Sequence, residues 1–280
     1  MGKIMKDPES SPKGKFSKIA DDYGQLSSLQ QSAGQVLIKK LKIREDEDIL
    51  DLGCGLGQLT AEIRKITQGS IFGVDPAASM IQKAKQTYAS QKIQFSVQSA
   101  EEFQIPHQVD VIFCNSSFQW YSDPVQAIKR CFEVLKPGGR IGMQAPAKKR
   151  YCPLFLDAFE RAVEDHRTPQ SFRTFVSPWF FLESSEDYKT LFEEEGFEVE
   201  SAEILMVTSR KTPGQVMDSF ESGAALAYCN PDCYQDSITQ EEFDDFRNIV
   251  RKNFNDMADD SGAMELLFNR IELVAKNHDL

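Results

Sequence analysis

Long apolar runs are absent from the 280-residue sequence. None approaches the roughly 18 residues that a membrane-spanning helix needs. Residues 1–15 also lack the apolar segment of a secretory signal peptide. The six cysteines are scattered, and three of them lie inside apolar stretches, which is typical of reduced, buried thiols. The sequence therefore predicts a cytoplasmic protein that has no membrane partner.

Basic and metal-ligating residues are also scarce. Lysine and arginine number 32 against 43 acidic residues, and the resulting net charge of −11 disfavours nucleic acid as a partner. Cys229 and Cys233 have a spacing that zinc allows, but no second cysteine or histidine pair follows nearby, so no metal site is predicted. Hydrophobic residues make up 41% of the chain without an excess of proline or glycine, which excludes wholesale disorder.

Short apolar strands alternate with helical patterns between residues 40 and 146. Strands are expected at 48–52, 70–74, 93–97, 109–114 and 140–143, and helices at 58–65, 79–89 and 126–135. A helical pattern also precedes the first strand, between residues 16 and 41. Such alternation indicates βαβ crossovers, and it predicts an α/β fold with a mostly parallel sheet.

The alternation stops after Pro146. Residues 147–183 are rich in aromatic residues and are expected to be irregular. Helices are expected at 185–195, 213–228 and 239–257, and strands at 197–208 and 265–275. We therefore predict a flexible tail (1–14), a core with N-terminal helices (15–146), an α-helical lid with part of the sheet edge (147–235), and a helix and strand that complete the core (236–280).

The first strand leads directly into Gly53, Gly55 and Gly57, and a helix follows. Glycines let the backbone turn tightly and approach a ligand at a helix N-terminus, although such a loop can also be only a tight turn. Asp75 ends the second strand, where a carboxylate can bind two ribose hydroxyls or, alternatively, cap the next helix. Because Asp51 precedes the glycines and their spacing is G-x-G-x-G, a nucleoside cofactor is favoured over a dinucleotide.

Five motifs in order resemble those of the class I S-adenosylmethionine-dependent methyltransferases. They are Asp51–Gly57, Val74–Met80, Ser99–Glu101, Asn115–Trp120 and Leu135–Gly139. The resemblance covers residues 16–146 and implies the family's Rossmann-like fold, a seven-stranded, mostly parallel, doubly wound sheet with an antiparallel final strand and an α-helical lid. It also implies S-adenosyl-L-methionine as the cofactor.

Within this family, Tyr23, Gln30 and the Phe118-Gln-Trp120 segment resemble the malonyl-carrier-protein and trans-aconitate carboxyl methyltransferases. Ser99 departs from that group, which often has aspartate there, and residues 147–235 match it only loosely. The cofactor-binding residues that the resemblance implies are Tyr23, Gln30 (or Gln31), Asp51, Gly53, Cys54, Gly55, Gly57, Asp75, Pro76, Met80, Ala100, Glu101 and Asn115.

The implied acceptor is a small-molecule or acyl-carrier-bound acid. A carboxylate is already ionised near pH 7, so its methylation needs a cationic clamp and no general base. The substrate-pocket candidates are Gln119, Trp120, Arg150, Tyr151 and Arg173, with Arg167 as a further cation, although any one arginine also fits a solvated surface position. The alternative is an N- or C-methyltransferase, which would use a carboxylate or histidine base, but the sequence favours none of its three histidines for that role. A regulator that binds the cofactor without turnover is a further, less favoured alternative.

Overall fold

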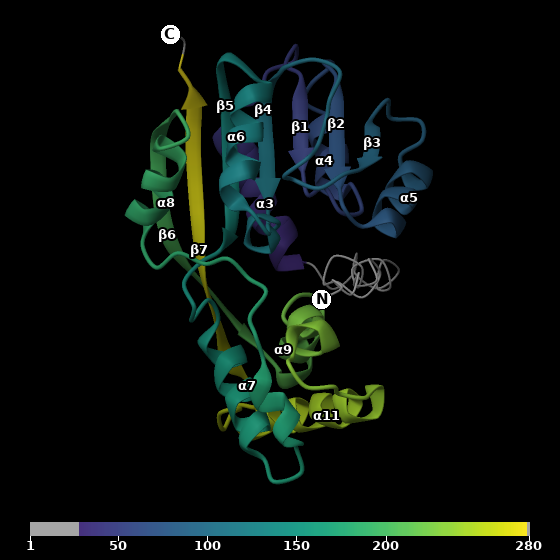
Figure 1. Cartoon of the computed structure of the whole chain (residues 1–280), viewed down its shortest axis with the longest axis vertical. Helices are drawn as coiled ribbons and strands as arrows, with labels where there is room; N and C mark the ends of the chain where they lie inside the picture. The colour runs from purple at the N-terminus through teal and green to yellow at the C-terminus, as the bar shows by residue number, and fades with distance from the viewer. Residues whose placement is uncertain (1–27, 279–280) are drawn as a thin grey trace, which may run out of the picture. The chain divides into compact units, whose positions relative to one another are not determined.

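The structure is a computed structural model that describes residues 28–278, and these divide into two compact units (Figure 1). The sheet unit contains residues 28–149 and 179–205 and the segment that begins at 269. The helical unit contains residues 150–178 and 206–268. Residues 179–205, which lie in the predicted segment 147–235 that includes part of the sheet edge, belong with the sheet.

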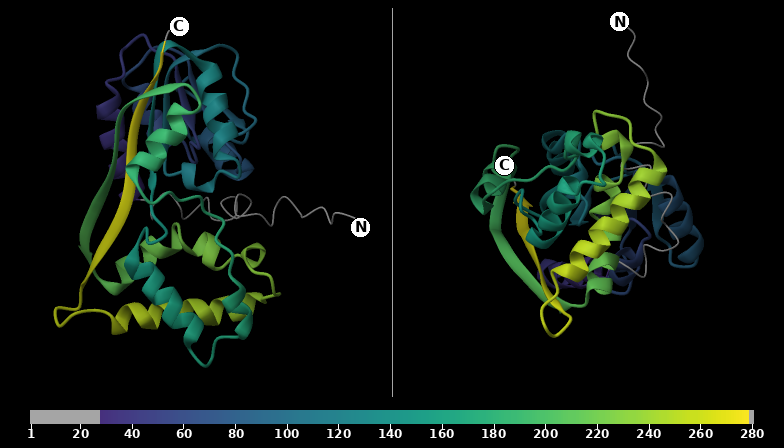
Figure 2. Two further views of the ribbon diagram at one scale, coloured as in Figure 1. Left: turned by 60° about the vertical axis from the view of Figure 1, so that its left-hand side comes forward. Right: turned by 90° about the horizontal axis from the view of Figure 1, so that it is seen from below.

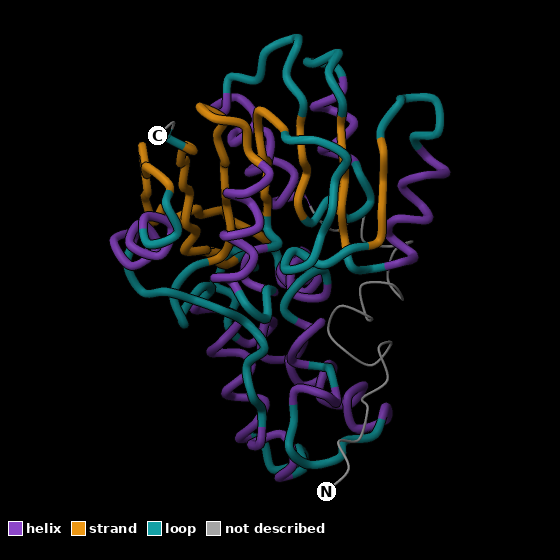
Figure 3. Tube along the Cα trace, turned by 45° about the horizontal axis from the view of Figure 1, so that its top comes forward, coloured by secondary structure: helices purple, strands orange, loops and turns teal. Residues whose placement is uncertain are grey.

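Seven strands form the sheet in the order β3-β2-β1-β4-β5-β7-β6 (Figure 1). Figure 3 draws the strands in orange. They are β1 (Ile49–Leu52), β2 (Ile71–Asp75), β3 (Gln94–Val97), β4 (Val109–Asn115), β5 (Leu135–Pro146), β6 (Phe197–Lys211) and β7 (Met264–Asn277). Strands β1 to β5 are parallel, and β7 is antiparallel to β5. The predicted fold class is confirmed, and the strand order reverses between β1 and β4, where doubly wound sheets bind ligands.

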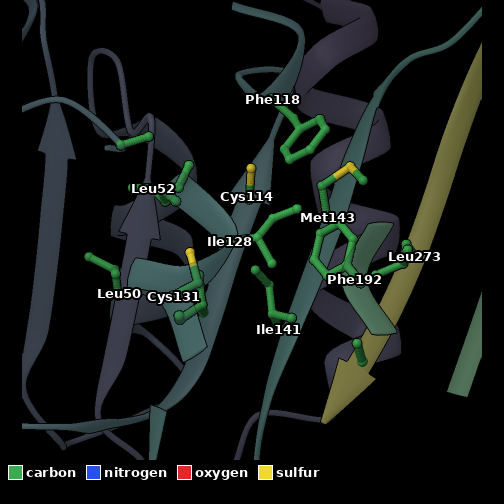
Figure 4. Close-up of a cluster of buried hydrophobic side chains, with 14 of the residues drawn as sticks. Leu50, Leu52, Cys114, Phe118, Ile128, Cys131, Ile141, Met143, Phe192 and Leu273 are labelled. Atoms are coloured by element: carbon green, nitrogen blue, oxygen red, sulfur yellow. The ribbon is translucent and has the colours of Figure 1, made fainter. Parts of the chain in front are cut away.

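One face of the sheet packs against α6 (Pro124–Val134) and α8 (Ser185–Glu193). Figure 4 shows Ile128 and Cys131 of α6 beside Leu50 of β1 and Cys114 of β4, all of them buried. Asp123 caps α6 by accepting a hydrogen bond from the Gln126 N–H, and Pro124 occupies the first turn, where no backbone donor is needed.

The other face packs against α3 (Ser28–Leu41) and α4 (Gln58–Arg64). Leu37 and Leu41 of α3 meet Ile49 of β1 and Val111 of β4 in a second buried cluster. Helix α5 (Ala78–Thr87) packs against Phe95 of β3. Because both faces are covered, β1 is buried at every position instead of alternating with polar residues.

Strand β5 is longer than the predicted 140–143. Its pairs with β7 extend from Arg140↔Lys276 to Pro146↔Arg270, and Leu135 pairs with Val109 across a register shift. The Lys136–Gly139 segment, which belongs to the fifth motif, is therefore an irregularity within the strand. The pairing with β7 explains the extension beyond residue 143, and sequence patterning of β5 alone does not reveal that pairing.

The helical unit contains α7 (Pro153–Glu164), η2 (Gln170–Thr174), α9 (Pro213–Glu221), α10 (Ala225–Tyr228), η3 (Pro231–Cys233) and α11 (Gln240–Asp256). The prediction that 147–183 is irregular is wrong for α7. Pro153 stands in the first turn, and Phe155, Ala158 and Ala162 recur at helical spacing on the buried face. Aromatic residues around this short segment obscure that period in the sequence.

Stacked and edge-on aromatic rings form the interior of the helical unit. The Phe159 and Tyr228 ring centroids lie 4.1 Å apart, and those of Phe172 and Phe246 lie 4.4 Å apart. Asn253 Nδ2 donates to the Ala158 carbonyl at 3.1 Å and so joins α11 to α7. The ribbons of these two helices can be followed by their colours in Figure 2. Among residues 28–278, no helix combines the length and the hydropathy that a bilayer crossing requires.

Candidate functional site

Strand β1 delivers the glycine loop to the carboxyl edge of the sheet. Gly53, Gly55 and Gly57 all have left-handed φ values, of 81°, 53° and 76°. The loop is tied to β2, because the Gly53 and Cys54 N–H groups both donate to the Val74 carbonyl at 2.8 and 3.0 Å. A side chain at Gly53 would meet Ser117 Cβ at 2.3 Å, and one at Gly57 would meet the Phe95 ring at 2.7 Å.

Gly55 differs from its two neighbours. A Cβ built there meets nothing among the described residues within 4 Å. The outer glycines are therefore required by packing, whereas Gly55 borders open space that a ligand can fill. This cradle fits a nucleoside cofactor whose binding requires close approach to the backbone.

Asp75 ends β2 beside this cradle. Its Oδ2 accepts the Gly55 N–H at 2.9 Å, and its Oδ1 accepts the Ala77 N–H at 2.8 Å. The N-cap residue of α5 is Ala77, so the alternative in which Asp75 caps that helix is wrong. A carboxylate can accept about four hydrogen bonds, which suits it to ribose hydroxyls as donors.

Asp51 lies in β1 just before the glycine loop, and Cys54 lies within the loop. Burial raises the pKa of the Asp51 carboxyl to about 7, against the opposing effect of a 2.6 Å hydrogen bond from the Thr60 hydroxyl and with a further increase from Asp75. Burial, together with the neighbouring Asp51 and Asp75, raises the pKa of the Cys54 thiol well above its usual value. Cys54 is thus a protonated thiol and is poorly suited to act as a nucleophile.

The other cofactor candidates lie on the loops around this edge. Met80 is buried in the first turn of α5, and Pro76 is exposed just before it. Ala100 is buried, and Glu101 accepts hydrogen bonds from the Ser122 N–H and hydroxyl, at 2.9 and 2.8 Å. Gln30 lies in the first turn of α3, and Tyr23 lies outside the described residues.

The loop after β4 closes the same edge. Asn115 is the last residue of β4, and its Nδ2 lies 3.2 Å from where a Cβ of Gly34 would stand. Ser117 Oγ donates to the Leu52 carbonyl at 2.9 Å and lies 3.1 Å from the Tyr121 hydroxyl. These bonds fix the loop against the start of the glycine loop, and sequence reasoning missed Ser117 because its contacts are formed only in the folded sheet.

Gln119 and Trp120 follow in a short 3-10 turn, η1 (Phe118–Trp120). Gln119 is buried, its Nε2 donates to the Ser116 carbonyl at 2.9 Å, and its Oε1 has no hydrogen-bond partner among the described residues. Trp120 packs edge-on against Trp179, with ring centroids 5.7 Å apart. Both candidates thus lie in the sheet unit, beside the loop after β4.

Arg150, Tyr151 and Arg173 belong to the helical unit. Arg150 forms a 2.7 Å ion pair with Asp157, and its side chain is 55% exposed. Tyr151 is buried and packs near Phe268, whereas Arg173 is exposed in η2. Arg167, the further candidate, pairs with Asp165 at 2.8 Å.

The three histidines lie away from the glycine loop or outside the sheet unit. His107 is 3.5 Å from Asp48, just before the amino end of β1. His166 is in the helical unit with its side chain 90% exposed, and His278 contacts Glu198 of β6. Neither the glycine loop with Asp75 nor the loop after β4 contains a histidine.

Sequence reasoning also missed Arg270 and Gln144. Both are buried, and the Arg270 guanidinium donates to Gln144 Oε1 and to Ser116 Oγ. A charged residue among the apolar residues of the last strand was the available signal. Its importance depends on the β5–β7 register, which the sequence does not specify.

Residues 49–139 match the family model described as a methyltransferase domain. The chain is 31% identical over 133 residues to the malonyl-[acyl-carrier protein] O-methyltransferase of Priestia megaterium, covering 46% of this chain and 48% of that protein. It is 28% identical over 128 residues to the trans-aconitate 2-methyltransferase of Deinococcus radiodurans, covering 45% and 48%. The match thus spans about half the length of these two curated relatives.

Among solved structures, the chain resembles the YcgJ protein of Bacillus subtilis with a TM-score of 0.58 and 16% identity. The match covers 89% of this chain and all of that one. At this identity the likeness establishes the fold alone.

Proposed function

We propose that the chain is a class I S-adenosylmethionine-dependent methyltransferase that methylates a carboxylate oxygen of a small-molecule or carrier-bound acid, since residues 49–139 match a methyltransferase domain. The two relatives named above support the acceptor class, since their names describe a carrier-bound malonyl group and trans-aconitate. We place the enzyme in the cytoplasm, because its cysteines are all free thiols and a reducing compartment keeps them so.

The proposal rests on one observation: the Asp75 carboxylate lies beside Gly55, and the described residues leave open space next to Gly55. Gly55 offers space where a side chain would fill the cradle, and Asp75 is fixed beside it by the Gly55 and Ala77 N–H groups. These residues would hold the sugar and the amino-acid part of S-adenosylmethionine. When bound, this cofactor supplies an electrophilic methyl group on sulfur, and transfer of that methyl to a carboxylate leaves a neutral thioether.

The residues of the chain itself position the acceptor against the cofactor. A carboxylate acceptor is ionised near pH 7, so no side chain has to remove a proton. The loop after β4 is held rigidly by the Ser117–Leu52 and Gln119–Ser116 hydrogen bonds, and it can orient the acceptor against the cofactor. The absence of a histidine from the glycine loop and from the loop after β4, both within the described residues, is consistent with this chemistry.

A methyl-transfer assay with carboxylic acids, amines and activated carbon acids tests the proposal. The assay measures S-adenosylhomocysteine formation and analyses the product for a methyl ester, which alkali should hydrolyse. We expect turnover with at least one acid and its loss in Gly55→Val. Methylation of amines or carbon acids alone would refute the carboxylate acceptor and support the alternative of an N- or C-methyltransferase. Binding of NADH with no binding of S-adenosylhomocysteine would contradict the cofactor.

A further inference from the structure

Gln119 of η1 is a buried amide of the sheet unit whose oxygen the described residues do not use. The residue is 5% exposed. Its Nε2 donates to the Ser116 carbonyl at 2.9 Å, whereas its Oε1 has no hydrogen-bond partner among residues 28–278. A buried acceptor that stays unpaired costs free energy, and the large majority of such groups in proteins are therefore paired. The amide oxygen of Gln119 is an exception that calls for a physical explanation.

The orientation of this amide is fixed. The Ser116 carbonyl can only accept, so the nitrogen of the amide must face it, and the opposite orientation would bring two oxygen acceptors together. The backbone carbonyl of Gln119 also accepts the Phe180 N–H at 2.9 Å. Main chain and side chain are thus both held, and Oε1 is a preorganised acceptor.

Ser116, which orients the amide, has an uncommon backbone conformation. It directly follows β4, and its φ is 58°, in the left-handed region that residues other than glycine seldom adopt. Its N–H donates to the Gln144 carbonyl at 2.7 Å, and its carbonyl accepts from Gln119. Sparsely populated backbone conformations that several bonds maintain cluster at functional sites, which agrees with a binding role for the amide that Ser116 holds.

Gln119 lies beside the glycine loop but outside the cradle. Its loop follows β4, whereas the glycine loop and Asp75 follow β1 and end β2. Ser117, two residues earlier, donates to the Leu52 carbonyl at 2.9 Å, so this loop borders the start of the glycine loop. Because the methyl acceptor must lie next to the cofactor, a loop in this position suits the acceptor.

Aromatic residues flank Gln119 on both sides in the chain. Phe118 packs edge-on against Phe180 with ring centroids 5.9 Å apart, and Trp120 packs against Trp179. A hydrogen bond is stronger in such apolar surroundings than in water. A charged ammonium donor would be costly to transfer there. A neutral hydroxyl is therefore the donor that matches this oxygen.

We propose that Gln119 Oε1 accepts a hydrogen bond from a hydroxyl group of the methyl acceptor, so that the enzyme selects a hydroxy acid. The inference rests on the proposed function and narrows its substrate class. An ionised carboxylate has no proton to donate, so the amide oxygen does not bind the group that is methylated. It binds a second group of the same molecule, and two points of attachment fix the orientation of the acceptor.

The test compares hydroxy acids with their analogues that lack the hydroxyl, in wild type and in Gln119→Met. The pairs are malate and succinate, citrate and tricarballylate, mandelate and phenylacetate, and salicylate and benzoate, and the probe is the pair with the fastest wild-type turnover. We expect the wild-type kcat/KM to be about tenfold higher for the hydroxy acid, which corresponds to about 1.4 kcal/mol. Methionine keeps the length of the side chain and removes the amide, so the two acids should react equally well in Gln119→Met.

Asn277→Ala is the matched control. Asn277 is also a buried amide of the sheet unit, but it donates to the Leu135 carbonyl at 3.1 Å, at the amino end of β5. Its loss should lower stability and leave the preference for the hydroxy acid unchanged. Unaltered affinity for S-adenosylhomocysteine establishes that Gln119→Met is folded, and the comparison of the two acids in wild type depends on no variant.

Three results would overturn the reasoning at different points. A wild-type preference below about threefold, or turnover of only the acids that lack the hydroxyl, would refute the selection of a hydroxy acid and leave the proposed function intact. An unchanged preference in folded Gln119→Met would show that another residue recognises the hydroxyl. Failure of the wild type to methylate any acid, with turnover of amines or carbon acids, would overturn the proposed function itself.

Discussion

Replacement of Asp75 by alanine should weaken cofactor binding far more than it weakens folding. The carboxylate is fixed by the Gly55 and Ala77 N–H groups, at 2.9 and 2.8 Å, and so faces the cradle in a defined orientation. A hydrogen bond to a charged group contributes about 1.5–3 kcal/mol. Loss of two ribose bonds should therefore reduce the affinity for S-adenosylhomocysteine by about 3 kcal/mol, or roughly 100-fold in Kd. Water can replace the acceptor for the two N–H groups, which limits the expected loss of unfolding free energy to about 1 kcal/mol.

Isothermal titration calorimetry with S-adenosylhomocysteine measures the first effect, and urea denaturation measures the second. Asp110→Ala is the control, because Asp110 also accepts a backbone N–H, from Asp48, but lies near the amino end of β4. That variant should bind the cofactor with unchanged affinity. A Kd for Asp75→Ala within threefold of wild type, in a protein with normal unfolding, would refute the assignment of Asp75 to the ribose.

Three further predictions concern other parts of the molecule. Gly55→Val should abolish measurable S-adenosylhomocysteine binding, because the branched side chain would occupy the cradle and would have to adopt a φ of 53°; calorimetry with near-normal affinity would contradict this. Asp51 has a folded-state pKa of about 7 against 3.8 as its ordinary value, so the stability due to its protonation is complete below about pH 4 and is lost as the pH rises to about 7. This effect is on the order of 4 kcal/mol. Asp51→Asn should lack this pH dependence, so the effect is measured by comparing the unfolding free energies of wild type and Asp51→Asn as the pH is varied. Hydrogen exchange should show protection of part of residues 147–235 when S-adenosylhomocysteine binds; a response confined to residues 53–57 would refute the predicted lid.

The elements that sequence reasoning predicted are those whose signal is local. The buried runs of β1 and β2, the glycines between β1 and α4, and the Thr239–Met257 helix with its capping threonine are encoded within a few neighbouring residues. Helix α7 was missed because aromatic residues crowd both sides of a twelve-residue segment. The length of β5 was missed because its partner lies more than a hundred residues away in the sequence.

The residues around the candidate site also divide into those that a local sequence signal indicates and those whose contacts depend on strand pairing. Gly53, Gly55, Gly57 and Asp75 could be proposed from the sequence because backbone conformation and strand ends restrict the residue types that can stand there. The proximity of Arg270 to Ser116 could not be predicted, because it exists only after β7 has paired with β5.

The position of β7 between β5 and β6 has a consequence for biosynthesis. During translation β7 emerges from the ribosome after every other described element, so a nascent chain can assemble the glycine loop while β6 still has no neighbouring strand in the sheet. Premature termination before residue 264 would then yield a polypeptide that has the glycine loop but exposes the edge of β5.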